Sequence, residues 1–206
     1  MLLLNKYVYE EKNLDKAFEK FEQETNLTKE DVLYTSTEEK GGLLKSSKVI
    51  LEIVKKEDLI SFIKDYFDNL ANGLNIEINS DINIEEDIIN INISSNDASA
   101  LIGKNGKMLN SLQVLLRKMI EVNTNVSLKI NLDVENYKKR KISYLERDIK
   151  KIIKEVLRTK VDVKLDPMNS YERRIVHNLV SNYGQLTSES EGESPNRCVV
   201  IKYIEG

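Results

Sequence analysis

Two short groups of residues in this sequence have types and spacing that suit chemistry. The first is the run Ile102-Gly103-Lys104-Asn105-Gly106-Lys107, in which two glycines stand three residues apart with lysines beside them. Glycines let the backbone turn sharply and let a second backbone approach closely, and the free N–H groups at the start of a following helix favour phosphate. Lys104 and Lys107 add positive charge at the same place. The run therefore predicts a contact with a phosphate-bearing ligand.

The second group is Arg173 and His177, which are four residues apart and so share one face of a helix. His177 is the only histidine in the chain. The pair suits contact with a phosphate or a base. The same spacing would also arise from an ordinary surface pair, or from a partly buried imidazole whose hydrogen bonds are made within the protein. A nuclease using His177 beside Glu172 or Asp166 is a third interpretation. Such chemistry needs a positioned partner and usually a metal or a nucleophile, and the sequence has no carboxylates clustered at ligand spacing. We therefore expect no catalytic residue, no metal and no cofactor.

Charge is distributed unevenly along the chain. The 206 residues carry a net charge of −3, yet residues 138–164 hold 11 basic and 4 acidic side chains, a local charge of +7. A basic segment in an acidic protein is a candidate contact with a polyanion. The alternative, that it is the solvated face of a surface helix, stays open.

Composition excludes several classes of protein. The single cysteine, Cys198, allows no internal disulfide, and two prolines and eight glycines exclude a collagen-like chain. Abundant Ile, Leu and Val argue against wholesale disorder. The N-terminus lacks a signal-peptide pattern, and no window approaches about 18 uninterrupted apolar residues. We expect a cytoplasmic protein with no membrane insertion.

Hydrophobic periodicity divides the chain into three segments. Residues 1–54 indicate a small α/β module: a strand over 2–9, a helix after Asn13, and strands over 32–36 and 48–54 around a turn at Gly41-Gly42. Residues 135–206 indicate a long helix to residue 159, a strand over 161–165, a helix over 170–182, a polar loop over 187–196 and a final strand over 198–204.

The middle segment places the glycine loop between two helices. Its expected elements are a helix over 59–70, strands over 74–78 and 89–93 around a turn at 79–87, a short helix from 97, the loop, a helix from 108 and a strand over 128–134. This is the element order of the bacterial type of KH domain, in which such a loop clamps about four nucleotides. The order favours that interpretation over a tight helix–helix turn with incidental lysines. No Gly-Lys-Ser or Gly-Lys-Thr follows at the spacing of a P-loop.

Three stretches resemble the Jag family, the SpoIIIJ-associated RNA-binding proteins also called KhpB or EloR. They are residues 100–113 (ALIGKNGKMLNSLQ), 132–140 (LDVENYKKR) and 165–177 (LDPMNSYERRIVH), the last followed by 190–197 (SEGESPNR). The third is similar to the Arg-x-x-x-His, or R-three-H, domain, which binds single-stranded nucleic acid. The resemblance covers nearly the whole chain. It implies an α+β protein of three small domains: a Jag N-terminal domain (1–54), a type II KH domain (55–134) and an R-three-H domain with a long connecting helix (135–206).

The resemblance also implies a function and partners. The function is that of an RNA chaperone or post-transcriptional regulator linked to cell elongation, division and envelope homeostasis. The ligand is single-stranded RNA, with single-stranded DNA as an alternative. The partner is a small single-KH protein of the KhpA type, and a homodimer is a further expectation. The chain departs from the family at Lys40–Lys45, which lacks the usual aromatic residue, and at Asn105, where relatives often have a basic residue.

The expected RNA-binding residues come from these motifs. The loop would hold the sugar–phosphate backbone, with bases against apolar residues beside it, and the second domain would contact phosphate or a base. The candidates are Ile102, Gly103, Lys104, Asn105, Gly106, Lys107, Arg173, Arg174, His177, Arg197, Lys138, Lys139, Arg140 and Lys141. Only 6% of residues are aromatic, so we expect modest affinity and weak sequence preference. The rival interpretation is a protein-interaction adaptor whose acidic N-terminal module docks on membrane-insertion or division machinery, with little RNA binding.

Overall fold

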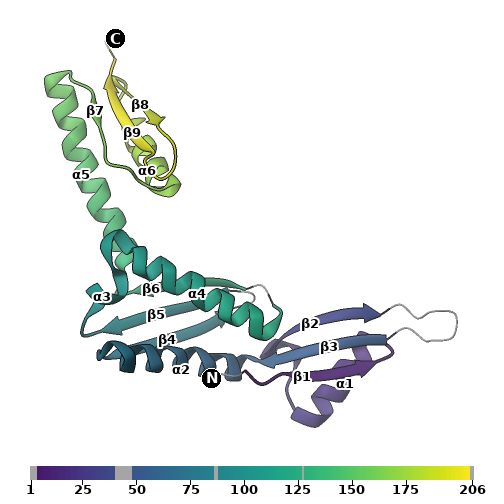
Figure 1. Ribbon diagram of the computed structural model, residues 1–206. Helices are drawn as coiled ribbons and strands as arrows, with labels where there is room; N and C mark the ends of the chain where they lie inside the picture. The colour runs from purple at the N-terminus through teal and green to yellow at the C-terminus, as the bar shows by residue number, and fades with distance from the viewer. Residues whose placement is uncertain (1–3, 40–47, 86–87, 127, 205–206) are drawn as a thin grey trace. The chain divides into compact units, whose positions relative to one another are not determined.

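The computed structural model describes residues 4–39, 48–85, 88–126 and 128–204 (Figure 1). Packing divides the chain into two compact units, residues 1–135 and 136–206. Each unit combines helices with a sheet, so the expected α+β class is confirmed. The two units are described separately below.

The first unit begins with a three-stranded antiparallel sheet in the order β1-β3-β2. Its elements are β1 (Tyr7–Glu11), α1 (Leu14–Thr25), a 3-10 turn (Lys29–Asp31), β2 (Val32–Glu39) and β3 (Lys48–Lys55). Helix α1 starts where the Asn13 side chain accepts a hydrogen bond from the Lys16 amide at 2.9 Å. Its apolar side, Phe18 and Phe21, packs on Leu51 and Ile53 of the central strand.

The expected strand over residues 2–9 is only partly correct. The strand starts at Tyr7 and extends to Glu11, because its register is set by pairing with Val49 to Ile53 of β3. Residues 4–6 form no strand. The departure from the family at Lys40–Lys45, and the turn at Gly41-Gly42, lie outside the described residues.

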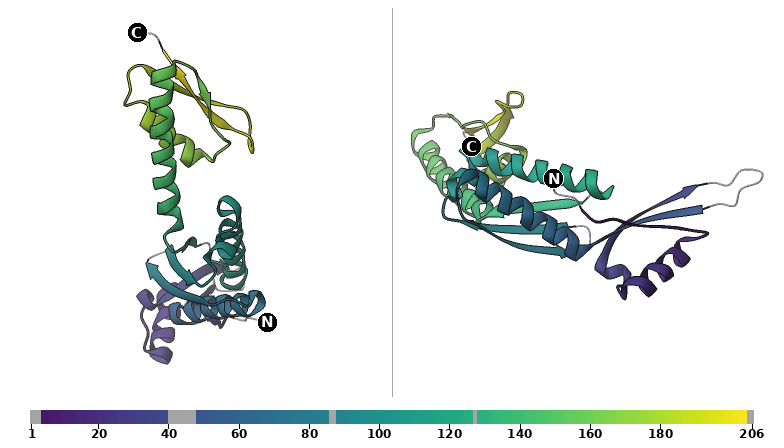
Figure 2. Two further views of the ribbon diagram at one scale, coloured as in Figure 1. Left: turned by 90° about the vertical axis from the view of Figure 1, so that its left-hand side faces the viewer. Right: turned by 60° about the horizontal axis from the view of Figure 1, so that its bottom comes forward.

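The rest of the first unit has the element order expected of a KH domain. Its elements are α2 (Lys56–Leu74), β4 (Ile78–Glu85), β5 (Ile88–Ser95), α3 (Ala98–Ile102), a 3-10 turn (Lys104–Gly106), α4 (Lys107–Thr124) and β6 (Lys129–Val134). The sheet order is β4-β5-β6, antiparallel between β4 and β5 and parallel between β5 and β6. Helices α2 and α4 cover one face of this sheet (Figure 2), where Ile89, Ile91 and Leu132 are fully buried.

The open face of this sheet explains an error in the elements expected for the first unit. Residues 79–87 were expected to form a turn, but Ile78–Glu85 is a strand, and Leu74 ends α2 instead of starting a strand. Asn, Asp and Ser suggest a turn. Here Asn83 lies opposite Asn90 and Asp81 opposite Asn92, on the face turned away from α2 and α4 (Figure 2). Polar residues are tolerated there because that face stays in water.

The second unit folds around a long helix and a second sheet. Its elements are α5 (Tyr137–Thr159), β7 (Val163–Lys164), α6 (Ser170–Val180), β8 (Leu186–Glu191) and β9 (Cys198–Tyr203), with sheet order β7-β9-β8. Ile149, Ile153, Val156, Val176 and Ile201 form its core. The expected loop over 187–196 was wrong in its first half, because Thr187 to Glu191 pair with β9. Helix α5 starts two residues later than expected, since Glu135 and Asn136 have left-handed φ angles of 48° and 57°.

Two joins in the chain are short. Strand β3 ends at Lys55 and α2 begins at Lys56, so no linker separates them. Only Glu135 and Asn136 separate β6 from α5. In the part of the chain that the structure describes, no helix has the length and apolar character needed to cross a membrane.

Candidate nucleic-acid interface

The glycine loop turns sharply because three of its residues have positive φ angles. Helix α3 ends at Gly103, whose amide donates to the Ser99 carbonyl at 2.8 Å. Gly103 and Gly106 have φ angles of 66° and 81°, and Asn105 between them has a φ of 57°. The Gly106 amide donates to the Gly103 carbonyl at 3.2 Å, which closes the turn. Helix α4 then starts at Lys107.

The loop requires its first glycine for two reasons. Gly103 combines φ 66° with ψ 180°, a region that is essentially limited to glycine. A Cβ atom placed on it would also lie 2.7 Å from the Cβ of Met108, which is closer than two non-bonded carbon atoms approach in proteins. The loop and the first turn of α4 are therefore in direct contact, which holds the loop against the start of that helix.

The loop presents its polar side chains to solvent. Lys104, Asn105 and Lys107 are exposed, Ile102 is half-buried, and Gly106 is buried. The first amides of α4 carry the positive end of the helix dipole, and Lys104 and Lys107 lie beside them. This is the combination of backbone donors and cations that binds phosphate groups. The six consecutive residues of the first motif thus span the end of α3, the turn and the start of α4.

The short helix before the loop has its own cap. The Asp97 carboxylate accepts a hydrogen bond from the Ser99 hydroxyl at 2.6 Å and from the Ala100 amide at 3.1 Å. These bonds hold the pKa of Asp97 below its usual value, with the serine hydrogen bond as the larger cause. A charged Asp97 therefore stabilises the helix that leads into Gly103.

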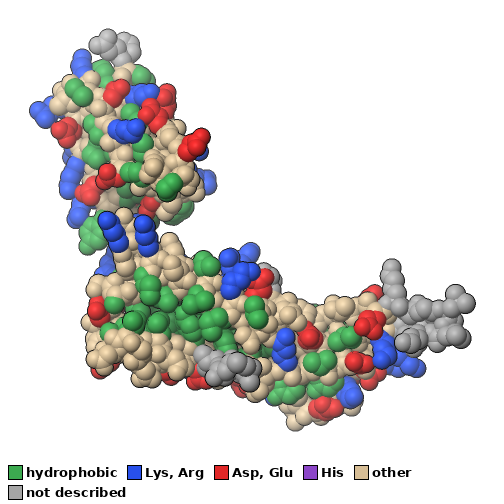
Figure 3. All heavy atoms as spheres, in the orientation of Figure 1, with side chains coloured by type: hydrophobic (Ala, Val, Ile, Leu, Met, Phe, Trp, Pro, Cys, Tyr) green, Lys and Arg blue, Asp and Glu red, His purple; other side chains and the backbone are tan. Residues whose placement is uncertain are grey.

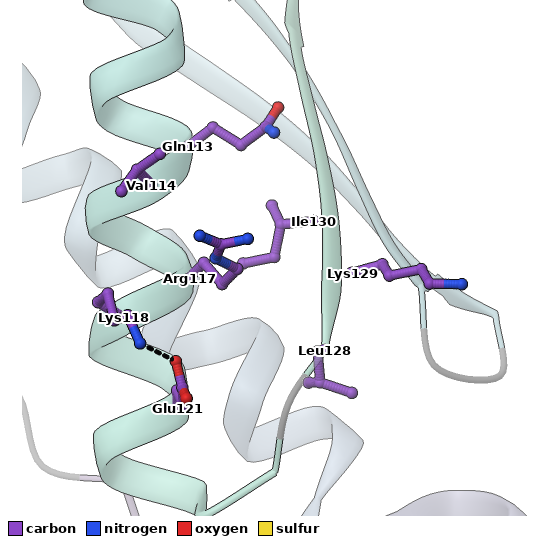
Figure 4. Close-up of a pocket in the computed structure, with 8 residues that line it drawn as sticks. All are labelled: Gln113, Val114, Arg117, Lys118, Glu121, Leu128, Lys129 and Ile130. Atoms are coloured by element: carbon purple, nitrogen blue, oxygen red, sulfur yellow. Dashed lines mark hydrogen bonds and ion pairs between the residues drawn. The ribbon is translucent and has the colours of Figure 1, made fainter.

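A groove of about 480 Å³ lies between α4 and β6 (Figure 4). It is lined by Gln113, Val114, Arg117, Lys118, Glu121, Leu128, Lys129 and Ile130. The Gln113 side chain accepts a hydrogen bond from the Leu132 amide at 3.2 Å, which ties α4 to the edge strand. Arg117 and Ile130 point toward one another across the groove in Figure 4, whereas Lys129 points away from α4. The groove thus combines an apolar wall with basic side chains on the helix that the glycine loop starts.

Three cations of this groove were missed in the sequence analysis. Arg117, Lys118 and Lys129 were not among the expected RNA-binding residues, although Arg117 and Lys118 lie about three turns beyond the loop on the same helix. Lys118 donates to the Glu121 carboxylate at 2.6 Å, a bond that lowers the pKa of Glu121. The adjacent Arg-Lys pair on α4 is the signal that would have found Arg117 and Lys118; Lys129 has no such signal.

In the second unit, Arg173 and His177 lie on α6 and both have partners within the protein. The Arg173 guanidinium donates to the Met168 carbonyl at 2.8 Å. The two ring nitrogens of His177 lie 2.7 Å from the Ser188 hydroxyl and 2.9 Å from the Ser190 hydroxyl. Both residues are half-buried. They therefore connect α6 to the preceding loop and to β8, and their contact with nucleic acid remains a prediction.

The backbone of Met168 also contacts the backbone of Arg197. The Met168 amide donates to the Arg197 carbonyl at 3.1 Å, while the Met168 carbonyl accepts from Arg173. Arg197 and Arg174 are exposed and Arg173 is half-buried. Met168 thus links the Arg173 guanidinium to the backbone of Arg197, and the unit carries three arginines from two separate stretches of the sequence.

The basic run at the start of α5 has a partly structural role. Lys141 forms an ion pair with the Glu172 carboxylate at 2.7 Å, and the side chain of Glu172 is only 10% exposed. The other oxygen of Glu172 accepts from the Asn169 amide at 2.9 Å, and the Asn169 side chain accepts from the Glu172 amide, which completes a capping box. Lys139 and Arg140 are exposed and Lys138 is half-buried. Lys141 therefore anchors α5 to the start of α6.

Among the described residues, no group of three or more His, Cys, Asp or Glu side chains is placed to hold a metal ion. The only histidine is bonded to two serine hydroxyls, as described above.

Two known family models match separate parts of this chain. A family model described as the KhpA/KhpB KH domain matches residues 60–134, and a model of the R-three-H domain matches residues 143–203. The glycine loop and the α4–β6 groove lie within the first match. Arg173, His177 and Arg197 lie within the second.

Whole-chain relatives extend the similarity to the N-terminal module. A Clostridium symbiosum protein named RNA-binding protein KhpB is 34% identical over 197 residues, which cover 92% of this chain and 88% of the relative. The Bacillus subtilis protein of the same name is 33% identical over 200 residues, 93% of this chain and 95% of the relative. The Lactiplantibacillus plantarum protein of that name is 30% identical over 145 residues, 70% of this chain and 45% of the relative. The expected resemblance is confirmed: with its KH and R-three-H domains, this chain belongs to the KhpB family.

Proposed function

We propose that this chain binds single-stranded RNA and acts as a non-catalytic RNA chaperone or post-transcriptional regulator. The observation that carries the proposal is the loop Gly103–Gly106, which presents Lys104 and Asn105 to solvent beside Lys107, the exposed first residue of an 18-residue helix. The relatives named RNA-binding protein KhpB support the same ligand. Such a protein acts where its RNA is, in the cytoplasm.

Three domains are expected from the sequence, 1–54, 55–134 and 135–206. In this proposal the second and third of them bind RNA. The KH loop holds the sugar–phosphate backbone through the first amides of α4, with Lys104 and Lys107 neutralising phosphates. Bases lie along the groove between α4 and β6, against its apolar wall and near Arg117. The R-three-H domain contributes Arg174 and Arg197, which are exposed. Arg173 and His177 hold α6 in place through their hydrogen bonds to Met168 and Ser188.

Fluorescence anisotropy of a labelled single-stranded RNA across a salt series tests this proposal. The loop variant is Lys104→Asp with Asn105→Asp. The matched control is Lys12→Asp with Gln23→Asp, which makes the same change in charge at exposed positions of the N-terminal module. Each lost phosphate contact to a single strand lowers the slope of log affinity against log salt by about 0.7. We expect the loop variant to bind weakly with a shallower slope and the control to bind like the wild type.

A second pair of substitutions tests the R-three-H domain. Arg174→Ala with Arg197→Ala leaves the side-chain bonds of Arg173 and His177 in place. We expect this variant to lose affinity while its thermal unfolding is unchanged. If wild-type protein binds no RNA at low salt, the proposal fails and the adaptor interpretation of the acidic N-terminal module replaces it.

The proposed partner is a second KH domain, either that of a small single-KH protein or that of another copy of this chain. Helix α4 supports this pairing because Leu115, Met119 and Val122 share one side of it. Leu115 and Val122 are 51% and 75% exposed, so this side of α4 presents apolar side chains to solvent that a partner could cover. We expect Leu115→Lys with Val122→Lys to yield monomers in analytical ultracentrifugation. A wild type that sediments as a monomer, alone and with a single-KH protein, would overturn the pairing.

A further inference from the structure

Helix α5 carries a stripe of cations within the basic segment 138–164, beyond the residues that the sequence analysis expected to bind RNA. Arg147, Lys151, Lys154 and Arg158 are separated by four, three and four residues, so they lie on one face of the helix. All four are exposed. The opposite face carries Ile149, Ile153 and Val156, which are buried in the core of the second unit. The stripe therefore faces solvent over its whole length.

The stripe is long and has a strong positive charge. From Arg147 to Arg158 it spans about 16 Å along the helix axis. Residues 147–158 hold five basic and two acidic side chains, a net charge of +3. Lys and Arg side chains recur along the edge of the unit that α5 forms (Figure 3). A linear array of this kind suits a linear polyanion better than a compact anion.

Lys151, in the middle of the stripe, has a salt-bridge partner. It lies 3.0 Å from the Asp148 carboxylate, and the two side chains are 70% and 58% exposed. Exposed ion pairs of this type contribute little free energy. Lys151 can therefore exchange Asp148 for a phosphate group at small cost.

An aromatic side chain stands at the N-terminal end of the stripe. Tyr144 is 55% exposed, and the guanidinium carbon of Arg147 lies 5.0 Å from the centre of its ring. An exposed tyrosine paired with an arginine offers a flat surface on which a base can stack. The acidic side chains of a peptide have no ring that could stack on this surface. A membrane-binding helix needs a free apolar face, and the apolar face of α5 is buried.

We infer that this face of α5 is a separate RNA-binding site, which holds the backbone of a single strand through Arg147, Lys151, Lys154 and Arg158 and stacks a base on Tyr144. The inference rests on the proposed function, because it names a further surface for the same ligand. Binding there is independent of base sequence, since phosphate contacts carry no sequence information. With this additional site, one chain binds a longer stretch of RNA.

The test compares two RNA lengths with full-length protein. The stripe variant is Arg147→Gln, Lys154→Gln and Arg158→Gln, which leaves Lys151 with Asp148. The control is Lys12→Gln, Lys16→Gln and Lys64→Gln, three exposed lysines of the first unit. The RNAs have about four nucleotides, the length that a KH loop clamps, and about 16 nucleotides, the upper size of a single-strand site on one domain. Binding is measured by anisotropy across a salt series.

We expect the stripe variant to bind the long RNA about tenfold more weakly, with a salt slope lower by about 2 for three lost contacts. The short RNA and the control variant are unaffected. Tyr144→Ala weakens the long RNA about fivefold or more, and Tyr144→Phe, which keeps the ring, does not.

Two results overturn the inference, and a third concerns the proposed function instead. A stripe variant that binds the long RNA as well as the control does excludes a site on α5. An equal loss for both lengths shows that the substitutions act on the other sites and overturns it as well. If wild-type protein binds neither RNA, the proposed function itself fails, and this outcome is distinct from the first two.

Discussion

The Cβ atom of Met108 occupies the space that a side chain on Gly103 would need, since a Cβ on Gly103 would lie 2.7 Å from it. Met108 is the second residue of α4 and Gly103 is the residue that ends α3. The distance between the two helices is thus set by the absence of one methyl group. Any residue other than glycine must push the start of α4 away from the loop.

We therefore expect Gly103→Ala to destabilise the first unit by about 1–3 kcal/mol, because it adds a clash to a backbone conformation reserved for glycine. Urea unfolding measures this change. The control is Gly73→Ala in α2, where an added Cβ meets nothing within 4 Å and alanine favours the helix. Equal stability of Gly103→Ala and wild type would show that α4 moves freely away from the loop.

The order of the elements around the two glycines predicted this loop, but the sequence did not predict strand β4. The apolar side of β4, Ile78, Ile82 and Ile84, has the alternation of a strand. Its polar side, with Asn79, Asp81 and Asn83, has the composition of a turn. The tertiary structure decides between them, because pairing with β5 satisfies the backbone whatever the outward side chains are.

The histidine of α6 leads to a second prediction. Ser188→Ala and Ser190→Ala each remove one hydroxyl from the His177 ring, and we expect each to cost about 1 kcal/mol of unfolding free energy. Thermal and chemical unfolding measure the loss. Ser143→Ala, at an exposed serine of α5, is the control. If neither serine matters, His177 is held by α6 alone.

These serines also show a limit of sequence reasoning about the candidate site. Arg173 and His177 were identified from their spacing on a helix. Their partners lie elsewhere: Ser188 and Ser190 are in a strand that was expected to be a loop, and Met168 contributes a backbone carbonyl. Contacts of this kind depend on the tertiary fold and have no signature in residue type.

Tyr9 supplies a prediction of pH dependence. Its hydroxyl donates to the Glu24 carboxylate at 2.8 Å, and burial together with this bond raises the pKa of Tyr9 to about 12. The folded state thus favours the neutral phenol. The stabilisation is complete below the ordinary pKa of about 10 and is lost as the pH rises toward 12.

The measurement compares wild type with Tyr9→Phe, which has no hydroxyl to ionise. We expect the difference in their free energies of unfolding to be constant up to about pH 10 and to shrink above it. Tyr171→Phe serves as the control, because Tyr171 is 63% exposed. A difference that does not change with pH would mean that Tyr9 ionises equally in both states.

The ion pair between Lys141 and Glu172 gives a fourth prediction. Lys141→Met leaves the Glu172 carboxylate with its capping bond but without its cation, in a position where it is 10% exposed. We expect a loss of about 1–2 kcal/mol, between the values for exposed and buried pairs. The double variant with Glu172→Gln should recover part of it, as a double-mutant cycle would measure. Additive effects would show that the two charges do not interact.

The direct join of β3 to α2 determines which side of α2 faces the sheet. Lys55 ends the strand and Lys56 starts the helix, so no spare residue absorbs a change in length. One inserted residue would turn the apolar stripe of Leu59, Phe62 and Ile63 by about 100°, since a helix turns once every 3.6 residues. That rotation would carry the stripe away from the sheet it covers. Exchange of the N-terminal module between relatives therefore has to preserve the residue count at this join.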